Sequence, residues 1–279
     1  MVIDTHQHFW RYQSEKHSWI NDRMKIIRRD FLPQDLIKVF NENKINYCVA
    51  VQADQSTSET NFLVELSETH SFIKGVVGWV DLKSEKLESY LNTYKNKDII
   101  KGFRHVVQDE SDHNFMLRPQ FLDGIKLLGK YDYCYDILVF PHQLGSVLEL
   151  TKKFPNQKFV LDHIGKPYIL DNFFYGWATL IREIGKLENV YCKFSGMITE
   201  ADHKNWKKEN IHPYMDLVME SFGSERVMFG SDWPVCLVAG NYSEVKKLVT
   251  DFISTFSLNE KNLIMYQNAI NFYNLNILL

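Results

Sequence analysis

Residues 2–10, Val-Ile-Asp-Thr-His-Gln-His-Phe-Trp, read as a short buried strand that ends in two histidines. Successive side chains of a strand point to opposite faces, so Asp4, His6 and His8 share one face. Two imidazoles held on one face can ligate a divalent metal or hydrogen-bond a carbonyl oxygen. The alternative is a pair of half-exposed histidines at a strand end, and a short motif by itself does not separate the two interpretations.

Apolar segments of strand character recur after this stretch and alternate with segments of helical spacing. The predicted strands cover residues 2–10, 45–53, 73–82, 99–107, 134–140, 158–163, 190–194 and 226–230. Helices are predicted at 33–44, 59–70, 84–94, 119–130, 143–154, 171–187, 213–222, 242–255 and 259–273, with Ser84 and Asp171 at two of the starts. Residues 11–29 lack clear periodicity and are predicted to form a long loop of the kind that is often functional.

The strand starts are too far apart for hairpins and have the spacing of βα units. Eight such units in 279 residues predict a closed (β/α)8 TIM barrel, in the α/β class, as one domain spanning residues 1–279. An open doubly wound sheet is the main competitor, but no Gly-x-Gly-x-x-Gly follows the first strand.

The composition and charge limit the classes of partner that the chain can bind. The chain is 45% hydrophobic and has a net charge of -3, without a basic stripe that could follow a phosphate backbone, so nucleic acid is excluded as a partner. The sequence has neither a signal peptide nor an apolar run of the ~20 residues that span a bilayer, which excludes a membrane partner and predicts a cytoplasmic protein. Four cysteines far apart in sequence are predicted to be buried thiols rather than disulfides or zinc ligands.

In a TIM barrel the active site lies at the carboxyl ends of the strands, so polar residues at those ends are candidate site residues. They are His6, His8, Gln52, Asp54, Trp79, Asp81, Arg104, His105, Gln108, His142, Asp162, His163 and Asp232, with Trp233 beside the last. Each has a structural alternative: Asp54 and Asp81 can cap helices, and Trp79 can fill the barrel mouth.

Five motifs in order along the chain carry a family resemblance. They are residues 2–10, Gly102-Phe-Arg-His105, Leu161-Asp-His-Ile-Gly-Lys-Pro167, Lys193-Phe-Ser-Gly196 and Met228-Phe-Gly-Ser-Asp-Trp-Pro234. Together they resemble the amidohydrolase superfamily and, within it, the lactonase branch that includes L-fuconolactonases and L-rhamnonolactonases. The likeness covers nearly the whole chain. It implies a (β/α)8 barrel in which His6, His8, His163 and Asp232 form the catalytic set.

The resemblance leaves the metal content open. The chain departs from the two-metal members of the superfamily because no lysine stands at the carboxyl end of the fourth strand; Lys101 lies at its start. Two options remain: one divalent ion, zinc, held by His6, His8, His163 and Asp232, or a metal-independent site.

The implied reaction is hydrolysis of the lactone of a sugar acid, a small-molecule substrate. Asp232 would accept the proton of the attacking water, and the imidazoles would polarise the carbonyl oxygen. The substrate-binding residues predicted beside them are Arg104, Trp79, Gln52, His105 and Trp233. Two alternatives stay open, a metal-dependent decarboxylase of an unsaturated acid and a barrel that binds a sugar acid without catalysis. The sequence does not specify which lactone is used or the oligomeric state.

Overall fold

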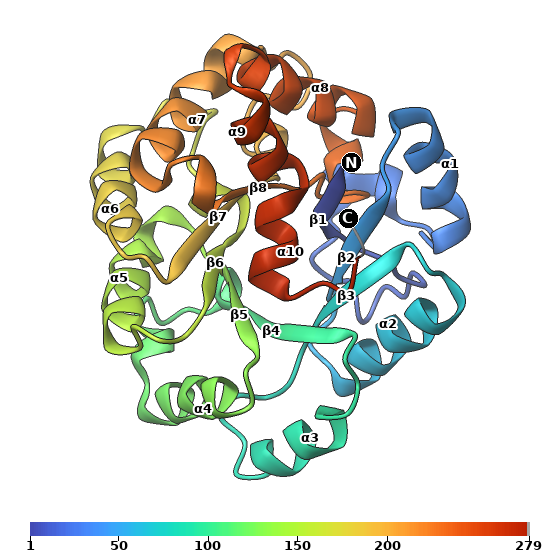
Figure 1. The fold of residues 1–279 in the computed structure, drawn as a ribbon, viewed down its shortest axis with the longest axis vertical. Helices are drawn as coiled ribbons and strands as arrows, with labels where there is room; N and C mark the ends of the chain where they lie inside the picture. The colour runs from blue at the N-terminus through green and yellow to red at the C-terminus, as the bar shows by residue number, and fades with distance from the viewer. Residues whose placement is uncertain (278–279) are drawn as a thin grey trace.

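The computed structural model describes residues 1–277, whose eight parallel strands pair in the order β1 to β8 (Figure 1). The strands are β1 (Ile3–Gln7), β2 (Tyr47–Val51), β3 (Ile73–Gly78), β4 (Ile100–Val106), β5 (Cys134–Leu138), β6 (Phe159–Leu161), β7 (Val190–Phe194) and β8 (Val227–Phe229). A parallel bridge between Gln7 and Trp233 joins the last strand to the first. The prediction of a (β/α)8 barrel is therefore confirmed.

Most of the helices form a ring outside the strands, and the last one crosses one end of the barrel (Figure 1). They are α1 (Pro33–Asn43), α2 (Thr57–Thr69), α3 (Leu87–Tyr94), α4 (Pro119–Lys130), α5 (Leu144–Lys153), α6 (Tyr175–Gly185), α7 (Lys208–Phe222), α8 (Tyr242–Phe252), α9 (Leu258–Asn262) and α10 (Asn268–Tyr273). None of the helices in residues 1–277 is long and apolar enough to cross a membrane.

Several predicted boundaries were wrong. Helix α3 begins at Leu87, and Ser84 instead caps a preceding turn by accepting from the Lys86 backbone N–H. Helix α6 begins at Tyr175 rather than at Asp171, because Asn172 has a φ of 53°, which a right-handed helix cannot pass through.

Three further predictions differ from the structure. Helix α7 begins at Lys208, so Pro213 lies inside it rather than at its start. The loop predicted for residues 11–29 contains a short 3-10 helix, Asp22–Ile27, which Asn21 caps. The last predicted helix is divided into α9 and α10 by a π-helical turn, Leu263–Gln267.

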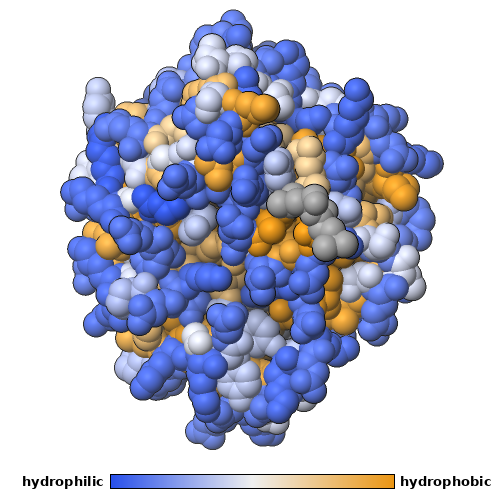
Figure 2. Space-filling view, viewed as in Figure 1, coloured by the Kyte–Doolittle hydropathy of each residue, from blue (hydrophilic) through white to orange (hydrophobic). Residues whose placement is uncertain are grey.

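The C-terminal helix closes one end of the barrel. Phe272 and Tyr273 of α10 pack with Val49, Val160 and Met228 of the barrel interior, and in Figure 1 this helix crosses the front of the strands. Figure 2 shows the same face as mainly hydrophilic, with hydrophobic atoms near its centre. The opposite end, where the strands terminate, is left for polar side chains.

The four cysteines lie in the packed interior, as predicted. Cys48, Cys134, Cys192 and Cys236 are all buried and carry free thiols.

Candidate active site

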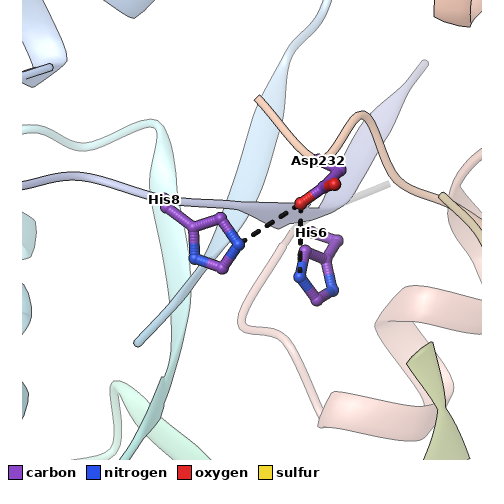
Figure 3. Close-up of side chains that lie close together, drawn as sticks. All are labelled: His6, His8 and Asp232. Atoms are coloured by element: carbon purple, nitrogen blue, oxygen red, sulfur yellow. Dashed lines mark ion pairs between the residues drawn. The ribbon is translucent and has the colours of Figure 1, made fainter. Parts of the chain in front are cut away.

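Three histidines and one aspartate converge at the carboxyl ends of the strands. Asp232 Oδ1 lies 3.4 Å from His8 Nε2, 3.9 Å from His6 Nε2 and 4.0 Å from His163 Nε2. Figure 3 shows the Asp232 carboxylate directed towards the rings of His6, on β1, and of His8, just after this strand. All four residues are at most 4% exposed. The structure thus brings together the four side chains that the sequence placed in the catalytic set.

The surrounding contacts orient the imidazoles. The Val51 carbonyl lies 2.8 Å from His8 Nδ1 and can only accept, so Nδ1 carries the proton and Nε2 keeps its lone pair. His6 has a donor-only group beside each ring nitrogen: Arg104 Nη1 lies 3.2 Å from Nε2, and Lys193 Nζ lies 3.2 Å from Nδ1. His6 Nδ1 then faces the carboxylate of Asp162 at 3.2 Å. The third histidine, His163, places Nδ1 2.9 Å from Ser195 Oγ.

Two of the convergent residues have left-handed backbone conformations. His163 has a φ of 54° and Asp232 a φ of 57°, and strain of this kind is concentrated at functional sites. A glycine makes room for the first: a Cβ at Gly196, whose φ is 59°, would lie 2.5 Å from His163 Nδ1. Gly196 of the Lys193–Gly196 motif therefore has a steric role at the site.

Asp4 supports the turn that carries Asp232. Its carboxylate accepts hydrogen bonds from the Ser231 backbone N–H at 2.8 Å and the Tyr242 hydroxyl at 2.9 Å. Burial raises the pKa of Asp4 to about 6, against the opposing effect of these hydrogen bonds. Asp4 thus holds Ser231, and with it the adjacent Asp232, against β1.

A fully buried charge cluster lies beneath the histidines. Lys193 Nζ on β7 lies 2.5 Å from Asp136 Oδ2 on β5 and 3.0 Å from Asp162 Oδ1. The Tyr273 hydroxyl of α10 donates to Asp136 Oδ2 at 2.8 Å. Sequence reasoning missed Lys193 and Asp136 as members of the site. The available signal was a charged residue within a short strand of a parallel barrel, where both faces are buried.

The cluster is held in its charged form. Burial favours the neutral amine, but Asp136 and Asp162 outweigh it and raise the pKa of Lys193. Burial also disfavours the Asp162 carboxylate, yet Lys193, His6 and Arg104 hold its pKa well below the usual range. Burial raises the pKa of Asp136 to about 6, while Lys193 opposes this effect. The two carboxylates therefore favour the ammonium form of Lys193.

The planar fork of Arg104 is engaged by the protein itself. Nη1 lies 3.1 Å from Asp162 Oδ2, and Nη2 donates to the Gln52 carbonyl at 2.5 Å. Arg104 also lines the cavity. A contact between Arg104 and the substrate stays a prediction, and the guanidinium group would make it while already paired with Asp162 and the Gln52 carbonyl.

A cavity of about 600 Å³ opens above the convergent residues and is lined by His8, His163, Asp232 and Arg104. The segment predicted as a functional loop contributes Lys16, Ser18, Trp19, Asn21 and Met24, and the other loops contribute Ala53, Asp54, Gln55, Val106, Gln108, Asp109, Leu138, Phe140, Lys166 and Val235.

Four predicted substrate-binding residues are not among the lining residues in the described part of the chain. Gln52 donates to the Arg104 carbonyl, Trp79 Nε1 lies 3.4 Å from His105 Nδ1, and Trp233 packs against Phe31. His105 is itself held by Glu110. These side chains support the residues that line the cavity.

Lys101 lies at the start of β4, away from the site, as the sequence indicated. Its ammonium group donates to the Asn274 carbonyl at 2.9 Å, beside a second cavity of about 290 Å³ that shares no lining residue with the first among residues 1–277.

The convergent donors fit one divalent ion. The Nε2 atoms of His8, His6 and His163 all lie within 4.0 Å of Asp232 Oδ1. Around a four-coordinate zinc with bonds of about 2.0–2.2 Å, neighbouring ligand atoms are roughly 3.3–3.5 Å apart. The separations from Asp232, 3.4 to 4.0 Å, need only a small contraction, and the donor atoms of His6, His8 and Asp232 all lie within 4.8 Å of one another. Three imidazoles and a carboxylate are also donors that zinc prefers.

Comparisons with known proteins agree with this fold. The amidohydrolase family model matches residues 3–275. The chain is 38% identical over 257 residues to an L-fucono-1,5-lactonase of Burkholderia multivorans, covering 88% of this chain and 86% of that protein. It is 33% identical over 243 residues to an L-fucono-1,5-lactonase of Burkholderia ambifaria, covering 87% and 83%.

A solved structure agrees over the full length. The crystal structure of an amidohydrolase from Burkholderia multivorans with bound zinc superposes with a TM-score of 0.95 at 37% identity, covering 99% of each chain. The matched family model and these similarities together show that the chain belongs to the amidohydrolase family.

Proposed function

We propose that the protein hydrolyses the cyclic ester of a sugar acid, of the L-fucono- or L-rhamnono-lactone type, to the open aldonic acid. The observation that carries the proposal is the Asp232 carboxylate, which lies 3.4 Å from a histidine nitrogen with a free lone pair at the base of a 600 Å³ cavity. The relatives named L-fucono-1,5-lactonase, which match more than four-fifths of the chain, support the same substrate class.

Asp232 is the proposed general base. Its carboxylate accepts a proton from water as the water oxygen bonds to the lactone carbonyl carbon. When the tetrahedral intermediate collapses, the bond from this carbon to the ring oxygen breaks. Asp232 then returns the proton to the leaving oxygen, which becomes a hydroxyl group of the open acid.

The three histidines are proposed to act on the carbonyl oxygen. His6, His8 and His163, together with Asp232, would hold one zinc ion, which supplies a Lewis acid when it is bound. In either form of the site, the contacts to Val51, Ser195 and the Asp162 carboxylate hold the three rings in place. Fixed polar groups of this kind stabilise developing charge without reorganising during the reaction.

The wall of the cavity suits a hydroxylated ring. Trp19 Nε1 and Gln108 Oε1 belong to lining residues, are buried, and have no hydrogen-bond partner among residues 1–277. The first is a donor and the second an acceptor, whereas a sugar hydroxyl is both. We propose that Trp19 and Gln108 bind substrate hydroxyl groups, with the indole against an apolar face of the ring.

The test is a panel of aldonolactones and muconolactones assayed by proton release, with and without chelator, using Asp232→Asn to correct for spontaneous hydrolysis. We expect the wild type to open sugar-acid lactones well above this background. Failure on every lactone would overturn the proposal. Carbon dioxide release from unsaturated acids, abolished by chelator, would identify a decarboxylase, and binding without turnover would identify a sugar-acid-binding barrel.

A further inference from the structure

A lysine is paired with two carboxylates directly beneath the proposed metal ligands. Lys193 and Asp136 are both fully buried, and their charged atoms lie 2.5 Å apart. Lys193 Nζ also lies 3.0 Å from Asp162 Oδ1 and 3.2 Å from His6 Nδ1. The ammonium group therefore contacts the base of the site from the side opposite the cavity.

The same atoms belong to a second set of potential metal ligands. His6, Asp162 and His163 have donor atoms that all lie within 4.8 Å of one another, separate from the group of His6, His8 and Asp232. Lys193 Nζ contacts two of these three residues. A cation bound between Asp162 and His6 Nδ1 would have to displace the ammonium group.

The charge balance of the cluster favours one divalent ion. Asp136, Asp162 and Asp232 face the cations Lys193 and Arg104, and all five residues are at most 4% exposed. With neutral imidazoles the cluster has one net negative charge. One divalent ion leaves one positive charge, which a hydroxide or a developing oxyanion neutralises. A second ion would leave three positive charges in a buried site, where uncompensated charge is costly.

We propose that Lys193 is a fixed cation that occupies the place of a second metal ion and so limits the centre to one divalent ion. The inference rests on the metal-binding form of the proposed function. Asp136 holds the ammonium group in position, and Tyr273 of α10 fixes Asp136. Lys193 is thus a positioning residue: it sets the net charge beside the metal ligands and does not touch the substrate.

The test measures zinc stoichiometry by elemental analysis after equilibration at a fixed free zinc concentration. We expect one equivalent in the wild type and in Lys193→Arg, which keeps the positive charge. Lys193→Met leaves Asp136 and Asp162 without their cation, and its zinc content should rise towards two equivalents. The double variant Lys193→Met/Asp136→Asn restores the net charge and should return to one. One equivalent in Lys193→Met, with unchanged zinc affinity, would overturn the proposal.

A second variant covers the case in which Lys193→Met does not fold. Asp136→Asn keeps the shape of the side chain but leaves Lys193 in excess, so zinc affinity, measured by chelator competition, should fall by about tenfold or more. Unchanged affinity in folded Asp136→Asn contradicts the proposal. A wild type that takes up no divalent ion also overturns it, while lactone hydrolysis, measured separately by proton release, stands or falls on its own result.

Discussion

Arg104 Nη1 lies 3.2 Å from His6 Nε2 and 3.1 Å from Asp162 Oδ2, so one guanidinium nitrogen connects a histidine of the proposed catalytic set to a buried carboxylate. This contact assigns Arg104 a structural role besides the substrate binding predicted for it from the sequence. Its replacement should therefore affect the stability of the fold as well as catalysis.

Arg104→Ala removes one of the two cations that face Asp162. Because this breaks a buried, hydrogen-bonded ion pair, the free energy of unfolding should fall by about 3–5 kcal/mol. The measurement is denaturant unfolding. The substrate-binding role predicted for Arg104 from the sequence would raise KM more than it lowers kcat, and the contact with His6 now predicts a loss of kcat as well. Arg104→Met, which fills more of the space, is the control for lost volume. An unchanged unfolding midpoint would show that the ion pair contributes nothing.

Asp232→Asn keeps the shape of the side chain but removes the proton acceptor. Loss of a general base typically lowers kcat by about 10²–10⁴-fold, and substrate binding should be retained. Steady-state kinetics on the best lactone measure both effects, with circular dichroism as the check on folding. Near-normal turnover would show that another group accepts the proton of the attacking water, and His163 would be the first to test.

Gly196→Ala should disturb His163. The new Cβ would lie 2.5 Å from His163 Nδ1, so the ring must move and kcat should fall by about tenfold or more. Gly223→Ala is the matched control, because Gly223 has a similar φ of 66° but no atom within 4 Å of the added Cβ. Both variants should lose stability from backbone strain, Gly223→Ala the more because its φ of 66° and ψ of 174° are essentially confined to glycine, and only Gly196→Ala should lose activity. Equal kcat values in the two variants would refute the steric role.

Glu59 should make stability depend on pH. Burial raises its pKa from 4.5 to about 7, so the folded protein binds a proton more tightly than the unfolded chain. The stabilisation that this proton provides is fully present below about pH 4.5 and is lost as the pH rises through 7. The free energy of unfolding should fall by about 3 kcal/mol over this range. Glu59→Gln keeps the acceptor for the Ala53 N–H, and the variant should be more stable than the wild type at pH 8 but not at pH 4.5. A stability difference between the two proteins that does not change with pH would contradict this assignment.

The pattern of strands and helices was predictable because it depends on local periodicity and spacing. The convergence of His6, His8, His163 and Asp232 followed from the rule that strand ends meet at one mouth of a barrel. The rule of strand ends could not place Lys193 and Asp136 at the site, because both residues lie within strands. Whether Trp79 or Gln52 lines the cavity depends on side-chain packing, which residue spacing does not encode.

The bridge between Gln7 and Trp233 joins the first strand to the segment after the last strand beside the site, where the Asp232 N–H donates to the His6 carbonyl at 2.7 Å. During synthesis, His6, His8 and His163 are all added before Asp232. A nascent chain therefore holds three imidazoles without their carboxylate until the segment that follows β8 arrives. Turnover should begin abruptly when the ring closes, so the appearance of activity during translation would time the completion of this barrel.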